Sequence, residues 1–196
     1  SRAVNRINLW SGTTSLPHNG LKSGRRLMFA ENELTAISDQ VEESRLITAR
    51  YNTNQTITYG TEYGSYGFRG VMPSYYDIEK LIIPPGKGRF INEIDMKEKN
   101  KVIVLDQKIA DVLFRNEEPL GKMVRAGQVM FKVVGINTKK EEWGGSNAYI
   151  PFSTAQAICN PQRKFWQVTF TVDGLTIGVA SGAVADGDRF LLKPFS

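Results

Sequence analysis

Strand-like and helix-like segments alternate through the second half of the chain, and this order limits the fold more than any other feature. Residues 101–105 (KVIVL), 131–136 (FKVVGI) and the start of 149–156 (YIPFSTAQ) are short apolar runs of the kind that form buried strands. Residues 106–114 (DQKIADVLF) carry apolar side chains at helical spacing, and residues 119–124 (PLGKMV) begin with turn formers. The order predicts an α+β (mixed α/β) fold without a large parallel sheet.

A long β-hairpin is predicted upstream of these segments. From Ser44 to Tyr59, Thr, Tyr, Ile and Arg residues alternate, residues 60–63 suit a turn, and residues 66–72 suit a returning strand. The aromatic and arginine side chains allow two interpretations: a stacking surface for single-stranded nucleic acid, or pairing across the hairpin, which is also compatible with a protein interface. The side chains concerned are Tyr51, Tyr59, Tyr63, Tyr66 and Phe68, with Arg45, Arg50 and Arg69.

Residue types typical of helix ends predict further short helices. An amphipathic helix is expected over residues 31–40. Ser74 and Asp77 fit a capping box, and the helix that they begin is expected to end before Pro84, because proline cannot continue it. One face of this helix would carry Tyr75, Ile78, Leu81 and Ile82.

The helix at 106–114 is expected to have Asp106 as its N-cap. Its apolar stripe would consist of Ile109, Val112 and Leu113, with Ala110 and Phe114 beside them. Residues 125–128 suit a tight turn between two strands. Residues 137–147 are polar and predict an exposed loop, and residues 167–172 predict a final strand.

Composition is that of an ordinary folded protein. The 196 residues are 41% hydrophobic and 23% charged, and a chain of this length buries about 70% of the surface that its unfolded form exposes. One domain or two small lobes are therefore expected. The net charge of +5 could favour nucleic acid or anionic lipid, but basic and acidic residues are interspersed along the chain.

The residues that usually carry catalysis are few. His18 is the only histidine and falls in a loop-like segment, so no Ser or Cys nucleophile has a convincing base, and GxSxG is absent. Cys159 is the only cysteine, which excludes an intrachain disulfide or a CxxC site and suggests a small buried apolar side chain. We expect no catalytic residues and no cofactor or metal site, and so not an enzyme.

Two motifs have a functional and a structural interpretation. Residues 85–90 (PGKGRF) suggest a phosphate loop but do not match GxxxxGK[ST], so a turn that needs positive φ at its glycines is favoured. Glu93, Asp95 and Glu98 could ligate Ca²⁺ or act in acid–base chemistry, as could the pair Glu141 and Glu142. Because lysines and arginines flank both acidic groups, a solvated charged face is favoured.

The longest apolar runs are far shorter than the about 20 residues that span a bilayer. The charged-then-apolar pattern of a signal peptide is also not expected in the first residues of the chain. If the sequence comes from a membrane protein, its spanning helices are expected outside it.

Several short motifs occur in an order that resembles the periplasmic core domain of MacB-type ABC transporter permeases. Residues 14–17 (TSLP), 19–21 (NGL) and 24–25 (GR) resemble the lead-in of that family, and Gly88-Arg89-Phe90 followed by Asp95 resembles a turn of it. The segments VIVL, ADVLF, PLGK, FKVVGI and YIPFSTAQ then follow in the family's order. The structural residues that the resemblance singles out are Gly88, Arg89, Phe90, Asp95, Phe114, Pro119, Gly121, Gly135 and Pro151.

The resemblance implies a role as a relay between proteins. The family's domain is inserted after the first transmembrane helix of a permease in the inner (cytoplasmic) membrane, and it faces the periplasm. A separate nucleotide-binding domain hydrolyses ATP, and this hydrolysis moves the periplasmic domain, a process called mechanotransmission. The implied partners are a second permease copy, a periplasmic adaptor protein and, through the membrane helices, the nucleotide-binding domain. No nucleic acid is implied; a basic nucleic-acid-binding module built on the hairpin from Tyr51 to Arg69 is the alternative.

The resemblance also implies two lobes. Residues 27–70 with 163–174 would form a porter-like α/β lobe, and residues 71–162 a β-rich, sabre-like lobe, after an extended lead-in at residues 1–26. Two departures from the family pattern occur. Asp106 stands where the family usually has Gly, and residues 175–196 lack the charged amphipathic helix expected to lead back to the membrane.

Overall fold

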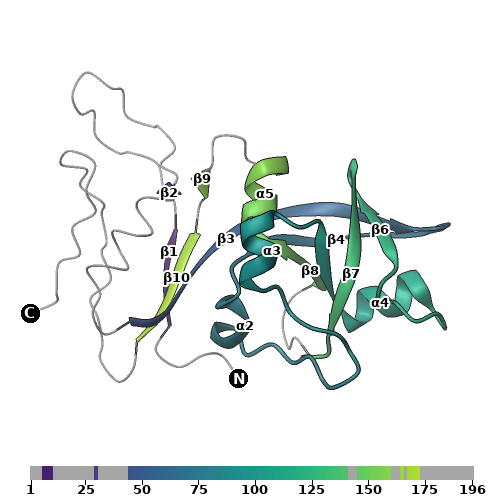
Figure 1. The fold of residues 1–196 in the computed structure, drawn as a ribbon, viewed down its shortest axis with the longest axis horizontal. Coiled ribbons are helices and arrows are strands. Elements are labelled where there is room, and N and C mark those ends of the chain that lie inside the picture. Colours follow the sequence, from purple (N-terminus) through teal and green to yellow (C-terminus); the bar gives the residue numbers. More distant parts are fainter. Residues whose placement is uncertain are drawn as a thin grey trace, which may run out of the picture.

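A computed structural model describes residues 6–10, 29–30, 44–140, 145–159, 164–165 and 167–172. The helices are α2 (Tyr75–Ile78), α3 (Glu93–Glu98), α4 (Gln107–Phe114) and α5 (Phe152–Cys159), shown in Figure 1. The strands are β1 (Arg6–Trp10), β2 (Phe29–Ala30), β3 (Ser44–Tyr59), β4 (Glu62–Val71), β5 (Val102–Asp106), β6 (Met123–Ala126), β7 (Val129–Asn137), β8 (Asn147–Pro151), β9 (Lys164–Phe165) and β10 (Gln167–Val172). The helix expected at 31–40 and the side chains of His18, Cys159, Glu141 and Glu142 lie outside the described residues.

Eight of the described strands form one mixed sheet in the order β1-β10-β3-β4-β8-β5-β7-β6. An additional pairing of β3 with β6 joins Ile57 to Ala126 and Thr58 to Arg125. Strands β3, β4, β8, β5, β7 and β6 therefore form a closed ring of pairings, called the ring below. Among the described strands, only the pairs β4–β8 and β5–β7 are parallel, which confirms the prediction of a mixed α and β fold without a large parallel sheet.

Strand β3 is shared between the ring and the pair β1–β10, and Figure 1 shows it as a long ribbon that joins them. Its first part pairs with β10 and its second part with β4. Arg50 stands where the two meet, because it pairs with both Gln167 and Val71. The predicted hairpin is thus confirmed, and its turn is formed at Gly60 with a positive φ of 57°.

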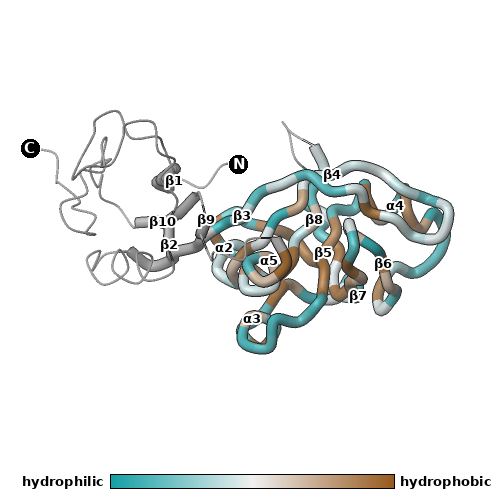
Figure 2. Tube along the Cα trace, turned by 90° about the horizontal axis from the view of Figure 1, so that it is seen from above, coloured by the Kyte–Doolittle hydropathy of each residue, from teal (hydrophilic) through white to brown (hydrophobic). Residues whose placement is uncertain are grey.

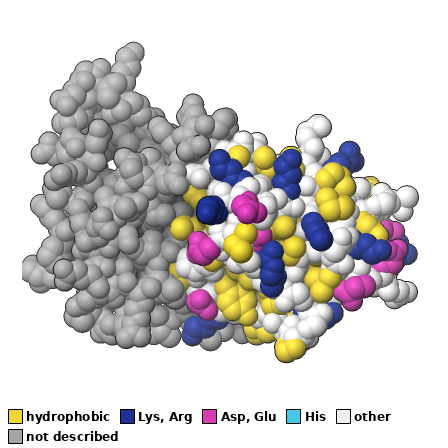
Figure 3. Space-filling view, viewed as in Figure 1, with side chains coloured by type: hydrophobic (Ala, Val, Ile, Leu, Met, Phe, Trp, Pro, Cys, Tyr) yellow, Lys and Arg dark blue, Asp and Glu magenta, His cyan; other side chains and the backbone are white. Residues whose placement is uncertain are grey.

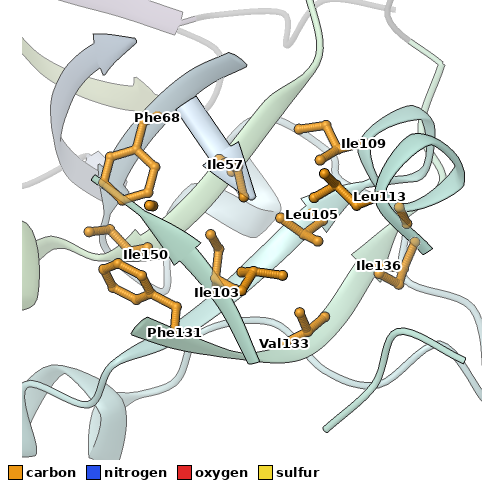
Figure 4. Close-up of a cluster of buried hydrophobic side chains, with 14 of the residues drawn as sticks. Ile57, Phe68, Ile103, Leu105, Ile109, Leu113, Phe131, Val133, Ile136 and Ile150 are labelled. Atoms are coloured by element: carbon orange, nitrogen blue, oxygen red, sulfur yellow. The ribbon is translucent and has the colours of Figure 1, made fainter. Parts of the chain in front are cut away.

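The first apolar core fills the inside of the ring. Strand β7 shows why its residues alternate: Phe131 and Val133 are buried, whereas Met130 and Lys132 are exposed. Figure 4 shows the side chains from several strands and from α4 pointing toward one another. The buried members are Ile57, Phe68, Ile103, Leu105, Ile109, Ala110, Leu113, Phe114, Val124, Ala126, Phe131, Val133, Ile136, Ala148, Ile150 and Ala155.

The buried face of helix α4 differs slightly from the apolar stripe predicted from the sequence. Ile109, Ala110, Leu113 and Phe114 are buried as two i, i+4 pairs. Val112 is 46% exposed, so its place in the predicted apolar stripe is wrong. It lies about 100° around the helix from Leu113, away from the centre of the buried face.

A second apolar core lies on the opposite face of the sheet. Its buried members are Val71, Tyr75, Leu81, Ile91, Val104 and Tyr149. Strands β5 and β8 contribute to both cores, because Leu105 and Ala148 face the first core whereas Val104 and Tyr149 face the second. Burial on both faces explains why these strands are continuous apolar runs in the sequence, and Figure 2 shows brown, apolar stretches along β5 and β7.

Helix α2 is shorter than predicted. It ends at Ile78, not before Pro84, because Lys80 adopts a positive φ of 51° and the amides of Lys80 and Leu81 bond back to the carbonyls of Asp77 and Tyr76. Ile82 lies beyond this end and is 51% exposed. The predicted capping box is also wrong, because the Ser74 side chain makes no hydrogen bond that caps the helix.

The tight turn predicted at residues 125–128 is confirmed, since Gly127 has a positive φ of 59° between β6 and β7. The final strand is confirmed with the bounds Gln167–Val172. Among the residues that the structure describes, no helix has both the length and the apolar character needed to cross a bilayer.

Candidate functional site

Asp106, at the end of β5, is the centre of a buried set of hydrogen bonds. Its Oδ1 accepts a hydrogen bond from Asn137 Nδ2 at 2.7 Å, and its Oδ2 accepts one from the Asn147 amide at 2.6 Å. All three residues are buried. Asn147 Oδ1 in turn accepts a bond from Arg69 Nε at 2.9 Å, so the carboxylate connects the ends of β5 and β7, the start of β8 and the last part of β4.

The set continues to β3 through a tyrosine. The Tyr75 hydroxyl accepts hydrogen bonds from Arg69 at 3.1 Å and from Arg50 at 3.2 Å. At the other end, Asn137 Oδ1 accepts a bond from the Ile82 amide at 3.0 Å. We call these side chains the polar network: Arg50, Arg69, Tyr75, Asp106, Asn137 and Asn147. It links the ring to the point on β3 where the pairing changes from β10 to β4.

The network corrects two predictions. Asp106 does occupy the N-cap position of α4, with extended backbone, but its side chain makes no capping hydrogen bond. Its carboxylate bonds Asn137 and Asn147 instead. The second prediction corrected is the exposed loop over residues 137–147. Its end residues, Asn137 and Asn147, are buried, and both donate hydrogen bonds to Asp106.

A second polar cluster surrounds Asp95 in α3. Arg89 contacts both carboxylate oxygens of Asp95, at 2.5 and 3.1 Å. Asn92 caps the helix with a full capping box: its Oδ1 accepts from the Asp95 amide, and its own amide donates to Asp95 Oδ2. Asn100 donates to Oδ1 at 3.2 Å.

The solvated face predicted for the acidic group is therefore wrong for Asp95, which is 1% exposed, and right for Glu93 and Glu98, which are exposed. Burial by itself raises the pKa of Asp95. The hydrogen bonds from Arg89, the Asn92 amide and Asn100, with the charge of Arg89, outweigh burial and leave the pKa of Asp95 below its ordinary value. The carboxylate is thus charged at neutral pH and fixes α3 to the turn before it.

The turn before α3 packs backbone against backbone. Gly86 and Gly88 have positive φ values of 81° and 84°, which confirms the structural interpretation of residues 85–90. Gly88 forms a bridge with Gly135 of β7. A Cβ on Gly88 would lie 2.2 Å from the Val134 carbonyl oxygen, and one on Gly135 would lie 2.0 Å from that of Arg89. Only glycine fits at this contact.

The remaining residues of the predicted motif fall into two groups. Phe90 and Gly121 adjoin the turn: Phe90 packs edge-on against Tyr149, and the Gly121 amide donates to the Val133 carbonyl beside Gly135. Phe114 and Pro151 make other contacts. The Phe114 ring lies 4.3 Å from the Tyr59 ring, measured between centroids. Pro151 of β8 pairs with Val71 of β4. Pro119 forms the turn before β6, where its carbonyl accepts from Lys122.

Aromatic rings connect the two polar clusters. Phe90 contacts Tyr149, and Tyr149 contacts Tyr75 of the polar network at 5.9 Å between centroids. Sequence reasoning missed Asn137, Asn147 and Tyr75 as members of a network. The only available signal was the position of the two asparagines, one at the end and one at the start of an apolar run.

The aromatic side chains of the hairpin mostly face inward. Phe68 is 1% exposed, and Tyr51, Tyr59 and Tyr66 pack against the first core. These contacts argue against a stacking surface. Tyr63 is the exception, at 71% exposed. Across the hairpin, Phe68 lies opposite Thr53 and Tyr66 lies opposite Gln55, and no two of the aromatic residues lie opposite each other. Within the described residues, His, Cys, Asp and Glu form no group that could hold a metal ion.

Comparisons with known proteins agree on one family. The model of the family described as MacB-like periplasmic core domain matches residues 2–187. The macrolide export ATP-binding/permease protein MacB 1/2 of Paracoccus denitrificans is 26% identical over 85% of this chain and 25% of its own length. MacB of Neisseria gonorrhoeae is 31% identical over 71% of this chain and 22% of its own length. The chain therefore spans a quarter or less of these relatives.

Solved structures show the same fold. The periplasmic region of MacB from Actinobacillus actinomycetemcomitans superposes with a TM-score of 0.72 at 22% identity, over 89% of this chain and 78% of that one. The extracellular domain of the noncanonic ABC-type transporter YknZ from Gram-positive bacteria gives 0.70 at 21% identity, over 85% of this chain and 84% of that one. The comparisons give no support to the nucleic-acid alternative.

The Asp95 cluster predicts a defined pH dependence. Because the folded pKa of Asp95 is depressed, its stabilisation is present above the unfolded value of about 3.9 and is lost as pH falls through the folded pKa. Asp95→Asn should lower the free energy of unfolding by about 1–3 kcal/mol at pH 7, and the difference from the unchanged protein should shrink below about pH 4. Denaturant unfolding between pH 3 and 7 measures this, with Glu93→Gln as the exposed control. A difference that stays constant over this range would contradict the assignment.

The glycine contact predicts unequal effects at two similar positions. Gly86→Ala should lower the free energy of unfolding by about 1–2 kcal/mol, because only the positive φ opposes the added methyl group. No atom lies within 4 Å of that methyl group. Gly88→Ala should lower the free energy of unfolding by about 1–3 kcal/mol more than Gly86→Ala, because its methyl group would also clash with the Val134 carbonyl. Unfolding free energies of the two variants test this. Equal costs would mean that the turn moves away from β7 freely.

Proposed function

Because the chain belongs to the family of MacB-like periplasmic core domains, we propose that it is the extracytoplasmic domain of an ABC transporter permease. Its proposed task is to transmit ATP-driven conformational change and to dock partner proteins, without chemistry of its own. The relatives are named ATP-binding/permease proteins for macrolide export. On this proposal a separate nucleotide-binding domain hydrolyses ATP, and the parent protein lies in the inner membrane with this region facing the periplasm.

One observation carries the relay function: strand β3 belongs to both parts of the sheet. A displacement applied to its β10-paired part passes along one covalent backbone into the ring. At Arg50, where the pairing changes, the side chain is bonded to Tyr75 and through it to the polar network. The network and the two cores on either side of the sheet oppose bending at this point.

The proposed partners are a second permease copy, a periplasmic adaptor protein and, through the membrane helices, the nucleotide-binding domain. The division into lobes is part of the same proposal: a porter-like lobe of residues 27–70 with 163–174 and a sabre-like lobe of residues 71–162. The proposed boundary falls at the end of β4, next to Val71 in the second core. Strands β3 and β4 of the porter-like lobe pair with β6 and β8 of the sabre-like lobe, so the two lobes would move together.

Spin labels test the relay in the full-length transporter. We would place labels on the exposed residues Lys108 and Ser65 in an otherwise cysteine-free protein and measure distances with and without ATP. Distances between equivalent labels in the two permease copies should change with nucleotide. The distance from Lys108→Cys to Ser65→Cys within one copy should stay constant, because the domain moves as a body.

A constant distance between the copies in all nucleotide states would refute transmission through this domain. A large change within one copy would refute a stiff relay.

A further inference from the structure

The outward face of the ring carries a row of side chains that crosses four strands. In register, Tyr63 of β4 pairs with Thr58 of β3, Thr58 pairs with Arg125 of β6, and Arg125 pairs with Met130 of β7. Directly paired residues of antiparallel strands project on the same face, with Cβ atoms about 5 Å apart. The four side chains therefore form one continuous row.

A second row lies beside the first. Met123 of β6 pairs with Lys132 of β7, on the same face as Arg125 and Met130, because each is two residues away along its strand. The residues between them, Val124 and Phe131, point into the first core. We call the surface formed by both rows the outward patch: Tyr63, Thr58, Arg125, Met130, Met123 and Lys132.

The patch exposes large apolar side chains that the described part of the chain does not cover. Tyr63 is 71% exposed, and Met123 and Met130 are each 45% exposed. Exposed Val112 and Ile94, by contrast, lie on α4 and α3. Tyr, Met and Arg are residue types enriched in protein interfaces, and methionine adapts its shape to irregular partners.

The charge of the patch has one sign. Arg125 and Lys132 are exposed, and neither has a carboxylate of the described residues within ion-pair distance. Two carboxylates of neighbouring segments are paired with other cations: Glu117 contacts Lys122 at 3.7 Å, and Glu62 contacts Arg115 at 2.7 Å. The other neighbours in the rows, Thr56 and Ser65, are uncharged. Figure 3 shows basic (dark blue), acidic (magenta) and hydrophobic (yellow) side chains interspersed over the visible face of the described part of the molecule.

We infer that the outward patch is the docking surface for a protein segment that presents carboxylates among apolar side chains. The carboxylates would pair with Arg125 and Lys132, while apolar side chains would cover Tyr63 and the two methionines. Charge complementarity of this kind selects the partner and speeds its encounter. The inference rests on the docking part of the proposed function and adds the surface and the chemistry of the partner.

A protein segment suits the patch better than nucleic acid or a lipid surface. Nucleic-acid sites track many phosphates with basic groups and stack bases on several aromatic rings. The patch has two cations in its rows and a single exposed tyrosine, separated by methionines. Two cations set into apolar surface match a small number of carboxylates.

Photocrosslinking in the full-length transporter, in cells, tests this inference. Tyr63→p-benzoylphenylalanine and Met130→p-benzoylphenylalanine place the probe in the patch, and Val112→p-benzoylphenylalanine on α4 is the matched exposed control. The supporting result is a protein adduct at both patch positions and not at the control. Mass spectrometry of the adduct should identify a peptide with at least two Asp or Glu residues next to apolar ones.

Charge reversal gives the second readout. Arg125→Glu combined with Lys132→Glu should lower the adduct yield at Tyr63 by about tenfold or more, whereas Lys108→Glu with Lys97→Glu, at exposed positions on α4 and α3, should not. Reversing the mapped carboxylates of the partner to Lys should restore the yield.

The inference is overturned by adducts with lipid, nucleic acid or a second permease copy, or by a mapped peptide without carboxylates. It is also overturned by unchanged yield after charge reversal, or by the absence of an adduct at the patch positions. Adducts are scored in a transporter that cannot hydrolyse ATP, so force transmission is not needed. Nucleotide-dependent motion without an adduct would remove only this inference, and an adduct without motion would remove only the relay.

Discussion

The buried carboxylate of Asp106 is the constraint on which the arrangement of the ring depends. A buried carboxyl group is tolerated only when hydrogen bonds replace its contacts with water. The side chain of Asn137 and the backbone amide of Asn147 supply these bonds, which fixes their positions. Asp106 and Asn137 are also direct partners in the parallel pair β5–β7. The carboxylate thus fixes the register of that pair and the start of β8 together, and through Asn147 and Arg69 it reaches β4.

This constraint connects the fold to the proposed relay. The ring alone would be a small barrel-like body from which the β10-paired part of β3 extends. The bonds from Arg50 and Arg69 to Tyr75, and the rings of Tyr75, Tyr149 and Phe90, attach both strands of the hairpin to the two polar clusters. The outward face of the same ring then remains available for a partner. Stiffness on the inside and recognition on the outside are separate properties of the same strands.

Much of the fold could be predicted from the sequence because its signals are local. Alternation over residues 44–59 gave the long strand, and the glycines of residues 85–90 gave the turn. The C-terminal end of α2 could not be predicted, because Lys80 in the left-handed conformation ends the helix where no Gly or Pro is present. The partners of Asp106 lie 31 and 41 residues away, so its local appearance as an N-cap was misleading. The sequence pattern of Asp95 is that of a surface acid, because its burial and its bonds to Arg89, Asn92 and Asn100 depend on the folded turn and helix.

The central claim is that the hairpin, the polar network and the ring form one stiff unit, and native-state hydrogen exchange of Tyr75→Phe tests it most directly. Removing the hydroxyl leaves two guanidinium groups without their shared acceptor, which should lower the opening free energy by about 1–3 kcal/mol. The account predicts the same decrease for amides in β3, β4, β7 and β8, and no decrease in Tyr76→Phe, whose half-buried ring lies beside it. Faster exchange confined to α2 would show that the network does not couple these strands.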